Sequence, residues 1–163
     1  GGTIWVESKE GKGSVFYFTI PLIGSRHETQ VGKRVIPEVV PDYSGQKVLV
    51  AEDEESNFEL LDILLSSLNL NVVWAKNGRE AVQLCSEDPD ISLVLMDLKM
   101  PVLDGYKVTR IIRESHPHLP IIAQTAFAMP ADRDEAIKAG CNDVVVKPIE
   151  KVELFTVIEK CLG

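Results

Sequence analysis

Two stretches at the start of the chain alternate between apolar and polar residues. Thr3–Ser8 and Ser14–Ile20 are rich in β-branched and aromatic side chains, and a loop that contains Gly11 and Gly13 joins them. This alternation predicts two antiparallel strands in a hairpin. An isolated hairpin is only marginally stable in water, so we expect it to be the edge of a domain whose body lies outside this sequence.

The pattern changes after residue 45. Pro21–Gly45 is interrupted by proline and glycine and shows no apolar period, which predicts a linker. From Gln46 onward, short apolar runs alternate with segments of helical spacing. The runs are Val48–Ala51, Val72–Ala75, Leu93–Met96, Ile121–Ala123 and Val144–Val146. Five apolar strands alternating with five helices predict an α/β domain with a doubly wound parallel sheet, covered by helices on both faces.

Local signals define several of these helices. Apolar residues share one face of the first helix, namely Phe58, Leu61, Leu64, Leu65 and Leu68. Asn77 followed by Glu80 predicts an N-cap at the start of the second helix. Pro130 and Gly140 predict the beginning and end of the fourth.

Composition limits the possible functions. The 163 residues include 45% hydrophobic side chains, which is too many for a disordered chain and enough for one domain with a core. No apolar run approaches the roughly 20 residues of a membrane helix, so we expect no membrane contact by this fragment. Residues 1–44 are neutral, whereas residues 45–163 carry the entire net charge of −8, which argues against direct binding of nucleic acid.

The cysteines and the N-terminus indicate the setting. Cys85, Cys141 and Cys161 form neither a CxxC motif nor a disulfide framework, so we expect a reducing, cytoplasmic location. The three histidines are expected to be surface residues rather than metal ligands. The chain starts with glycine and has no secretory signal, and we interpret it as a piece of a longer protein.

Candidate chemistry lies where the predicted strands end. Glu52 and Asp53 follow the first strand and Asp97 the third, while Thr125 and Lys147 follow the fourth and fifth. In such sheets, ligands bind beyond the carboxyl ends of the strands. Crowded carboxylates repel one another unless a cation intervenes, and Mg²⁺ prefers oxygen ligands of this kind.

This set of groups is suited to phosphoryl transfer. Asp97 is the best candidate nucleophile, because Met100-Pro101 and Asp104-Gly105 predict an open loop just beyond it. Each acid taken alone could simply cap the following helix. The five residues together, at four of the strand ends, favour a common site.

Residues 46–163 resemble a response-regulator receiver domain. The resemblance rests on VLVAED at Val48–Asp53, LMDLKMPVLDGY at Leu95–Tyr106, Gln124-Thr125-Ala126 and Val146-Lys147-Pro148. The separations fit as well: 44 residues from Asp53 to Asp97, 28 more to Thr125 and 22 more to Lys147. The resemblance implies a flavodoxin-like sheet with strand order 2-1-3-4-5.

The resemblance also implies roles for individual residues. Asp97 would accept a phosphoryl group from a phosphohistidine, and Thr125 and Lys147 would contact that group. Mg²⁺ would be bound by Asp53, Asp97, the main-chain carbonyl of Lys99 and, through water, Glu52. The bond between Lys147 and Pro148 would be cis.

One departure from the family pattern concerns Val144. The family commonly has an aromatic residue three positions before the lysine, and its rotamer reports phosphorylation. Phe127 and Tyr106 lie near the same edge, although we expect them to serve in packing. In the family, the positions of Lys99 and Phe127 tune the lifetime of the acyl phosphate.

The N-terminal residues resemble the end of a histidine-kinase ATPase domain, in GTIWVES at Gly2–Ser8 and GKGSVFYF at Gly11–Phe18. We therefore divide the chain into a kinase fragment at residues 1–22, a linker at residues 23–45 and a receiver domain at residues 46–163. The parent would be a hybrid sensor histidine kinase. Because the ATP-binding motifs are absent here, this piece is expected to catalyse only its own aspartyl phosphorylation and hydrolysis.

Three functional hypotheses follow. The first is a receiver that takes its phosphoryl group from its own kinase core or from a histidine phosphotransfer protein. An aspartate-nucleophile phosphatase is the second, but it would need an acid where Lys99 stands. The third is a degenerate receiver that acts as a phosphorylation-independent interaction module. The hairpin could additionally support self-association.

Overall fold

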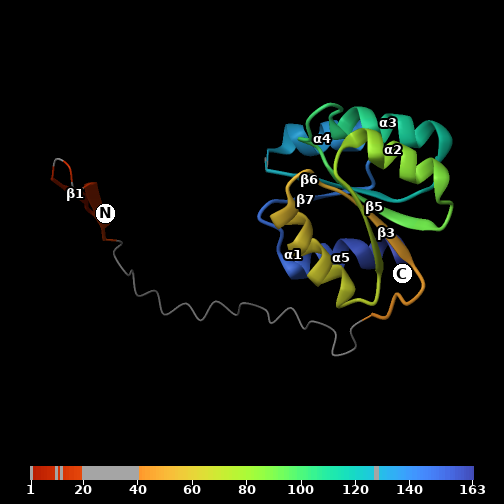
Figure 1. The fold of residues 1–163 in the computed structure, drawn as a ribbon, viewed down its shortest axis with the longest axis horizontal. Coiled ribbons are helices and arrows are strands. Elements are labelled where there is room, and N and C mark those ends of the chain that lie inside the picture. The colour runs from red at the N-terminus through yellow and green to blue at the C-terminus, as the bar shows by residue number, and fades with distance from the viewer. Residues whose placement is uncertain (1, 10, 12, 20–40, 127–128) are drawn as a thin grey trace. The chain divides into compact units, whose positions relative to one another are not determined.

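The computed structural model describes residues 2–9, 11, 13–19, 41–126 and 129–163. The chain divides into two compact units, residues 1–35 and 36–163. The first unit contains a hairpin and the second an α/β domain (Figure 1). Among the described residues, no helix combines the length and apolar character that crossing a bilayer requires.

The hairpin consists of β1 (Ile4–Lys9) and β2 (Gly13–Phe18), which pair in antiparallel register and confirm the predicted hairpin. The second strand begins at Gly13, and the last residue predicted for it, Ile20, lies outside the described residues. Most of the predicted linker, residues 23–40, lies outside them as well. One face of the hairpin is apolar and exposed, and consists of Ile4, Val6, Phe16 and Phe18.

The second unit has a five-stranded parallel sheet with the order β4-β3-β5-β6-β7. Counted within this domain, the order is the predicted 2-1-3-4-5. The strands are β3 (Lys47–Ala51), β4 (Asn71–Ala75), β5 (Ile91–Asp97), β6 (Ile121–Thr125) and β7 (Asp143–Val146). The helices are α1 (Glu55–Ser66), α2 (Gly78–Glu87), α3 (Gly105–Ser115), α4 (Pro130–Ala139) and α5 (Lys151–Leu162).

Helices cover both faces of the sheet, with α1 and α5 on one side and α2, α3 and α4 on the other (Figure 1). Successive strand residues therefore belong to different cores. In β3, Val48 and Val50 pack with α1 and α5, whereas Leu49 and Ala51 pack with the other three helices. Burial on both faces explains why the strands are apolar without alternation.

The predicted helix boundaries are confirmed. Asn77 accepts hydrogen bonds from the main-chain nitrogens of Arg79, at 3.1 Å, and of Glu80, at 3.0 Å. Helix α4 begins at Pro130, and Gly140 ends it in the left-handed conformation with a φ of 114°. The Lys147–Pro148 peptide bond is cis, as predicted.

Candidate functional site

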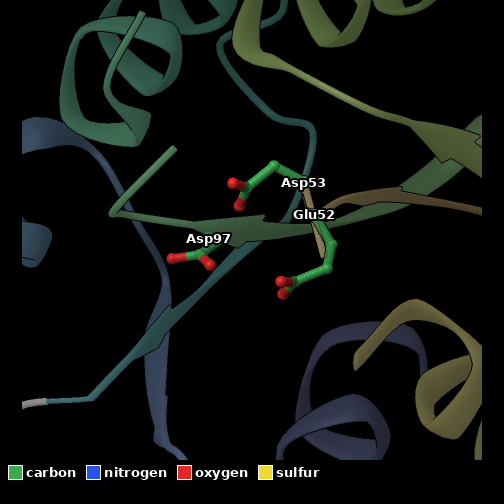
Figure 2. A group of neighbouring side chains, drawn as sticks. All are labelled: Glu52, Asp53 and Asp97. Carbon is green, nitrogen blue, oxygen red and sulfur yellow. The ribbon is translucent and has the colours of Figure 1, made fainter. Parts of the chain in front are cut away.

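Three carboxylates meet at the carboxyl ends of β3 and β5 (Figure 2). Each of Glu52, Asp53 and Asp97 offers an oxygen within 4.8 Å of the other two. Glu52 is fully buried and Asp97 is 6% exposed, whereas Asp53 is open to solvent. The prediction that these acids converge at one sheet edge is therefore confirmed.

Lys147, directly after β7, connects two of these acids. Its Nζ lies 2.7 Å from Glu52 Oε2 and 2.6 Å from Asp97 Oδ2. Burial by itself lowers the pKa of Lys147, but the hydrogen bonds and charges of Asp97 and Glu52 outweigh it, so the pKa is raised. The lysine is therefore a firmly charged cation beside the candidate nucleophile.

Glu52 is held on several sides. Asn57 Nδ2, from the first turn of α1, donates to Glu52 Oε1 at 2.9 Å, and the main-chain nitrogen of Glu54 approaches the same oxygen at 3.4 Å. The indole nitrogen of Trp74 donates to the main-chain carbonyl of Glu52 at 2.8 Å. Trp74 itself stacks on Phe58, with ring centroids 4.2 Å apart. These contacts hold Oε1 of Glu52, and its other carboxylate oxygen, Oε2, faces Lys147.

The main chain around Asp97 is fixed in a similar way. The main-chain nitrogen of Lys99 donates to Asp97 Oδ1 at 2.8 Å, and that of Gly105 donates to the carbonyl of Leu98 at 3.2 Å. A Cβ on Gly105 would overlap the carbonyl oxygen of Asp97, so only glycine allows α3 to start this close to Asp97.

Thr125 and Lys147 lie side by side at the same edge. Thr125 is the last residue of β6 and is 3% exposed, and its main-chain carbonyl accepts from the nitrogen of Lys147 at 2.7 Å. Val144, at the position where the family commonly has an aromatic residue, is buried in the core. Tyr106 packs half-buried against that core, as predicted for a packing residue. Phe127 lies outside the described residues.

Sequence reasoning missed two contributors to the site, Asn57 and Trp74. A weak signal existed for Asn57, a polar residue in the first turn of the helix that follows the acids. Trp74 stands in a predicted apolar strand, where a tryptophan reads simply as core. Their contacts with Glu52 depend on how α1 and β4 are placed against β3.

The donor set suits a hard cation. Three carboxylates offer only oxygen atoms, and Mg²⁺ is bound through few carboxylates together with water and phosphate. Exposed Asp53 leaves an approach from solvent, while buried Asp97 and Glu52 are anchored by Lys147. The residues present therefore fit Mg²⁺.

The family model of the response regulator receiver domain matches residues 48–159, which is more than half of the chain. The chain belongs to the response regulator receiver family. It is thus a receiver module of two-component phosphorelay signalling. The solved receiver domains also confirm the flavodoxin-like fold, and one example is the receiver of the sensor histidine kinase PA1611 from Pseudomonas aeruginosa. That structure, described with a magnesium ion in its active-site cleft, is 37% identical, has a TM-score of 0.67, and the match covers 74% of this chain and 99% of that one.

Two further similar proteins take part in signalling. The sensor kinase/phosphatase LuxQ of Vibrio vulnificus is 36% identical over 155 residues, which cover 94% of this chain and 18% of LuxQ. The receiver domain of Ssk1 from Saccharomyces cerevisiae, solved with the histidine phosphotransfer protein Ypd1, is 30% identical. Its TM-score is 0.65, and the match covers 76% of this chain and 89% of that one. The chain spans only 7% to 26% of the length of the first five curated relatives that it matches.

Proposed function

We propose that Asp97 is the phosphoacceptor of this receiver and that it takes its phosphoryl group from a phosphohistidine. The observation that carries the proposal is the position of the Lys147 ammonium, 2.6 Å from Asp97 Oδ2, beside three clustered carboxylates. A carboxylate nucleophile next to a fixed cation and a hard-metal donor set has what phosphoryl transfer requires.

In the proposed reaction, an oxygen of Asp97 attacks the phosphorus of the phosphohistidine. The new O–P bond forms as the N–P bond breaks, and the imidazole nitrogen leaves with the bonding pair. Lys147 and Thr125 bind the phosphoryl oxygens, and the main-chain nitrogen of Lys99 orients the carboxylate. Hydrolysis of the acyl phosphate by water then restores Asp97.

We assign the metal to Asp53 and Asp97, with the main-chain carbonyl of Lys99 and, through water, Glu52. When bound, Mg²⁺ would neutralise charge that develops on the transferring phosphoryl group. In this structure Glu52 Oε2 is engaged by Lys147 and Oε1 by Asn57, which favours an indirect role for Glu52 at the metal.

The test is to incubate the chain with a small phosphodonor and Mg²⁺ and to weigh it intact. We expect a product heavier by one phosphoryl group, which is absent without Mg²⁺ and absent from Asp97→Asn. Asp134→Asn, at an exposed acid of α4, is the matched control and should react normally. If the native chain forms no adduct, the degenerate receiver is favoured instead. Steady release of phosphate over many turnovers without an accumulating adduct would favour the phosphatase.

For the N-terminal unit, we propose that residues 1–22 end a kinase ATPase domain, residues 23–45 link it to the receiver, and the parent is a hybrid sensor kinase in the cytoplasm. The similarity to LuxQ covers 94% of the chain, so it must reach into the first 22 residues. The exposed apolar face of the hairpin supports a covering domain in the parent and self-association in the isolated chain. Deleting residues 1–22 should therefore lower the number of chains per particle in solution. An unchanged oligomeric state would contradict this.

For the partner, we propose that a histidine phosphotransfer protein or the kinase core docks on α1. Leu60 and Ile63, one turn apart on this helix, are 47% and 69% exposed, and α1 begins two residues after Asp53. Ile63→Lys should slow phosphorylation by a phosphotransfer protein at least about 10-fold and leave phosphorylation by a small donor unchanged. Equal slowing with both donors would contradict docking at this surface.

A further inference from the structure

Asn57, in the first turn of α1, reaches the site with its side chain, and the proposed reaction assigns it no task. The residue is half-buried. Asparagine is a poorer helix former than alanine, because its amide competes for hydrogen bonds of the main chain. Helix formation therefore does not account for an asparagine at this position, whereas its contact with Glu52 gives it a task.

The amide of Asn57 is the main restraint on one oxygen of Glu52. Asn57 Nδ2 donates to Glu52 Oε1 at 2.9 Å, whereas the main-chain nitrogen of Glu54 is 3.4 Å from the same oxygen, beyond the usual range of such bonds. A fully buried carboxylate needs hydrogen-bond donors to offset the loss of water. Within the described part of the chain, removing the Asn57 amide deprives Oε1 of its closest donor.

The other oxygen of Glu52 holds Lys147. Glu52 Oε2 is 2.7 Å from the lysine Nζ, which is also 2.6 Å from Asp97 Oδ2. Glu52 and its neighbour Asp53 point in different directions, so the two consecutive acids serve different partners (Figure 2). Glu52 stays a carboxylate when Asp97 accepts a phosphoryl group, and it can therefore hold the lysine before and after transfer.

A lysine at a phosphoryl site has to be held in place. Its side chain is long and flexible, and its charge stabilises a transferring group best when the ammonium is fixed in advance. The contacts from Asn57 to Glu52 and from Glu52 to Lys147 form a continuous chain of hydrogen bonds between the first turn of α1 and the ammonium beside Asp97.

We propose that Asn57 is a positioning residue of the phosphoacceptor site, which orients Glu52 so that Glu52 holds the Lys147 ammonium beside Asp97. The inference rests on the proposed function of Asp97. Asn57 itself touches neither the phosphoryl group nor Asp97, and it acts through Glu52. A neutral amide suits this role, because it fixes the carboxylate without neutralising the charge that attracts Lys147.

The first measurement compares Asn57→Ala with the native chain, with acetyl phosphate as the donor and saturating Mg²⁺. We expect the rate of adduct formation, followed by intact mass, to fall about 10-fold, the effect of losing a hydrogen bond to a charged group. Asn142→Ala is the matched control. Asn142 Oδ1 accepts hydrogen bonds from the main chain of Ile121 and from Arg113, at the amino ends of β6 and β7. This control should melt at a lower temperature and keep the native rate.

A second measurement reads the position of Lys147 without metal or phosphodonor. Acetic anhydride modifies accessible lysines, and mass spectrometry of peptides gives the rate of modification at each one. In Asn57→Ala, Lys147 should be modified several-fold faster than in the native chain, at most about 10-fold. Lys47, which is paired with Asp88, is the internal reference and should react at an unchanged rate.

A reciprocal exchange separates positioning from a loosened fold. Asn57→Asp places a second carboxylate against Glu52, so the rate of adduct formation should fall further than in Asn57→Ala. Adding Glu52→Gln exchanges donor and acceptor, since the new amide can donate to the new acid and still turn its oxygen to Lys147. The double variant should react at least about 10-fold faster than Asn57→Asp alone. All rates are taken at saturating Mg²⁺, because Glu52 is assigned to the metal through water.

Three results would overturn the inference alone. The first is a native chain that reacts while Asn57→Ala keeps its rate, and the second is a double variant no faster than Asn57→Asp. The third is equal modification of Lys147 in the native chain and in Asn57→Ala. A native chain that forms no adduct would instead overturn the proposed function, and this inference with it.

Discussion

Two lysine–carboxylate pairs lie at opposite ends of the same sheet. At the amino end, Lys47 Nζ is 2.6 Å from Asp88 Oδ2, and both side chains are more than a quarter exposed. At the carboxyl end, Lys147 Nζ is equally close to Asp97 Oδ2, but the Asp97 side chain is only 8% exposed. The distances are the same, so distance alone does not distinguish the pair proposed to be functional from the structural pair.

The difference lies in what surrounds each pair. Lys147 faces a second carboxylate, Glu52, and exposed Asp53 lies beside that group. At the amino end, a hydrogen bond from Lys47 lowers the pKa of Asp88, and Asp88 in turn raises the pKa of Lys47. That pair neutralises itself, whereas the carboxyl end keeps surplus negative charge that can hold a divalent cation.

The largest expected difference concerns the lysines themselves. Lys147→Met should slow phosphorylation of Asp97 by at least about 100-fold, because the cation at the phosphoryl site is lost. The free energy of unfolding of the same variant should be lower by about 3 kcal/mol, because the charges of Glu52 and Asp97 are left buried without the lysine. In Lys47→Met, Asp97 should be phosphorylated at the native rate. Equal loss of rate in the two variants, by intact mass over time, would remove the distinction between the two ends.

The second expected difference is in Mg²⁺ binding. Saturating Mg²⁺, at about 100 times its dissociation constant, should stabilise the native chain by about 2.7 kcal/mol. Asp53→Asn should remove most of this gain while changing the stability without metal very little, because Asp53 is exposed. Asp90→Asn, near the amino-end pair, should keep the full gain. Thermal unfolding with and without Mg²⁺ measures this stabilisation in the native chain and in both variants.

The smallest expected difference is in acid. In the folded chain, the pKa of Asp88 lies below its ordinary value. The contribution of Asp88 to the stability of the fold is therefore complete when the pH is above that ordinary value, and it is lost as the pH falls through the pKa of the folded chain. Asp88→Asn should therefore lower the melting temperature slightly at neutral pH and reduce its decline between about pH 5 and pH 2. Asp134→Asn is the control. A decline as steep as that of the native chain would show that the amino-end pair contributes nothing.

Much of the fold could be predicted because the signals are local. Continuous apolar runs marked the five strands of the sheet, and Asn77, Pro130 and Gly140 marked helix ends. The extent of β5 was underestimated, since it begins at Ile91 and continues through Asp97. A polar end residue still continues a strand when the neighbouring strands pair with it, and pairing is not visible in a hydropathy pattern.

The candidate site was only partly predictable, for a related reason. The rule for parallel sheets brought Glu52, Asp53 and Asp97 together from their positions alone. It did not indicate that Glu52 would share Lys147 with Asp97, because that depends on how far each side chain reaches.

Trp74 gives the site a built-in optical signal. The chain has two tryptophans, and Trp5 lies in the hairpin, so Trp5→Phe would leave a single emitter. That emitter donates to the main chain of Glu52 and lies against Phe58, with the Lys76 ammonium 4.4 Å from its ring. Rearrangement of the acidic residues would alter its surroundings directly, which makes label-free fluorescence titration of the receiver practicable.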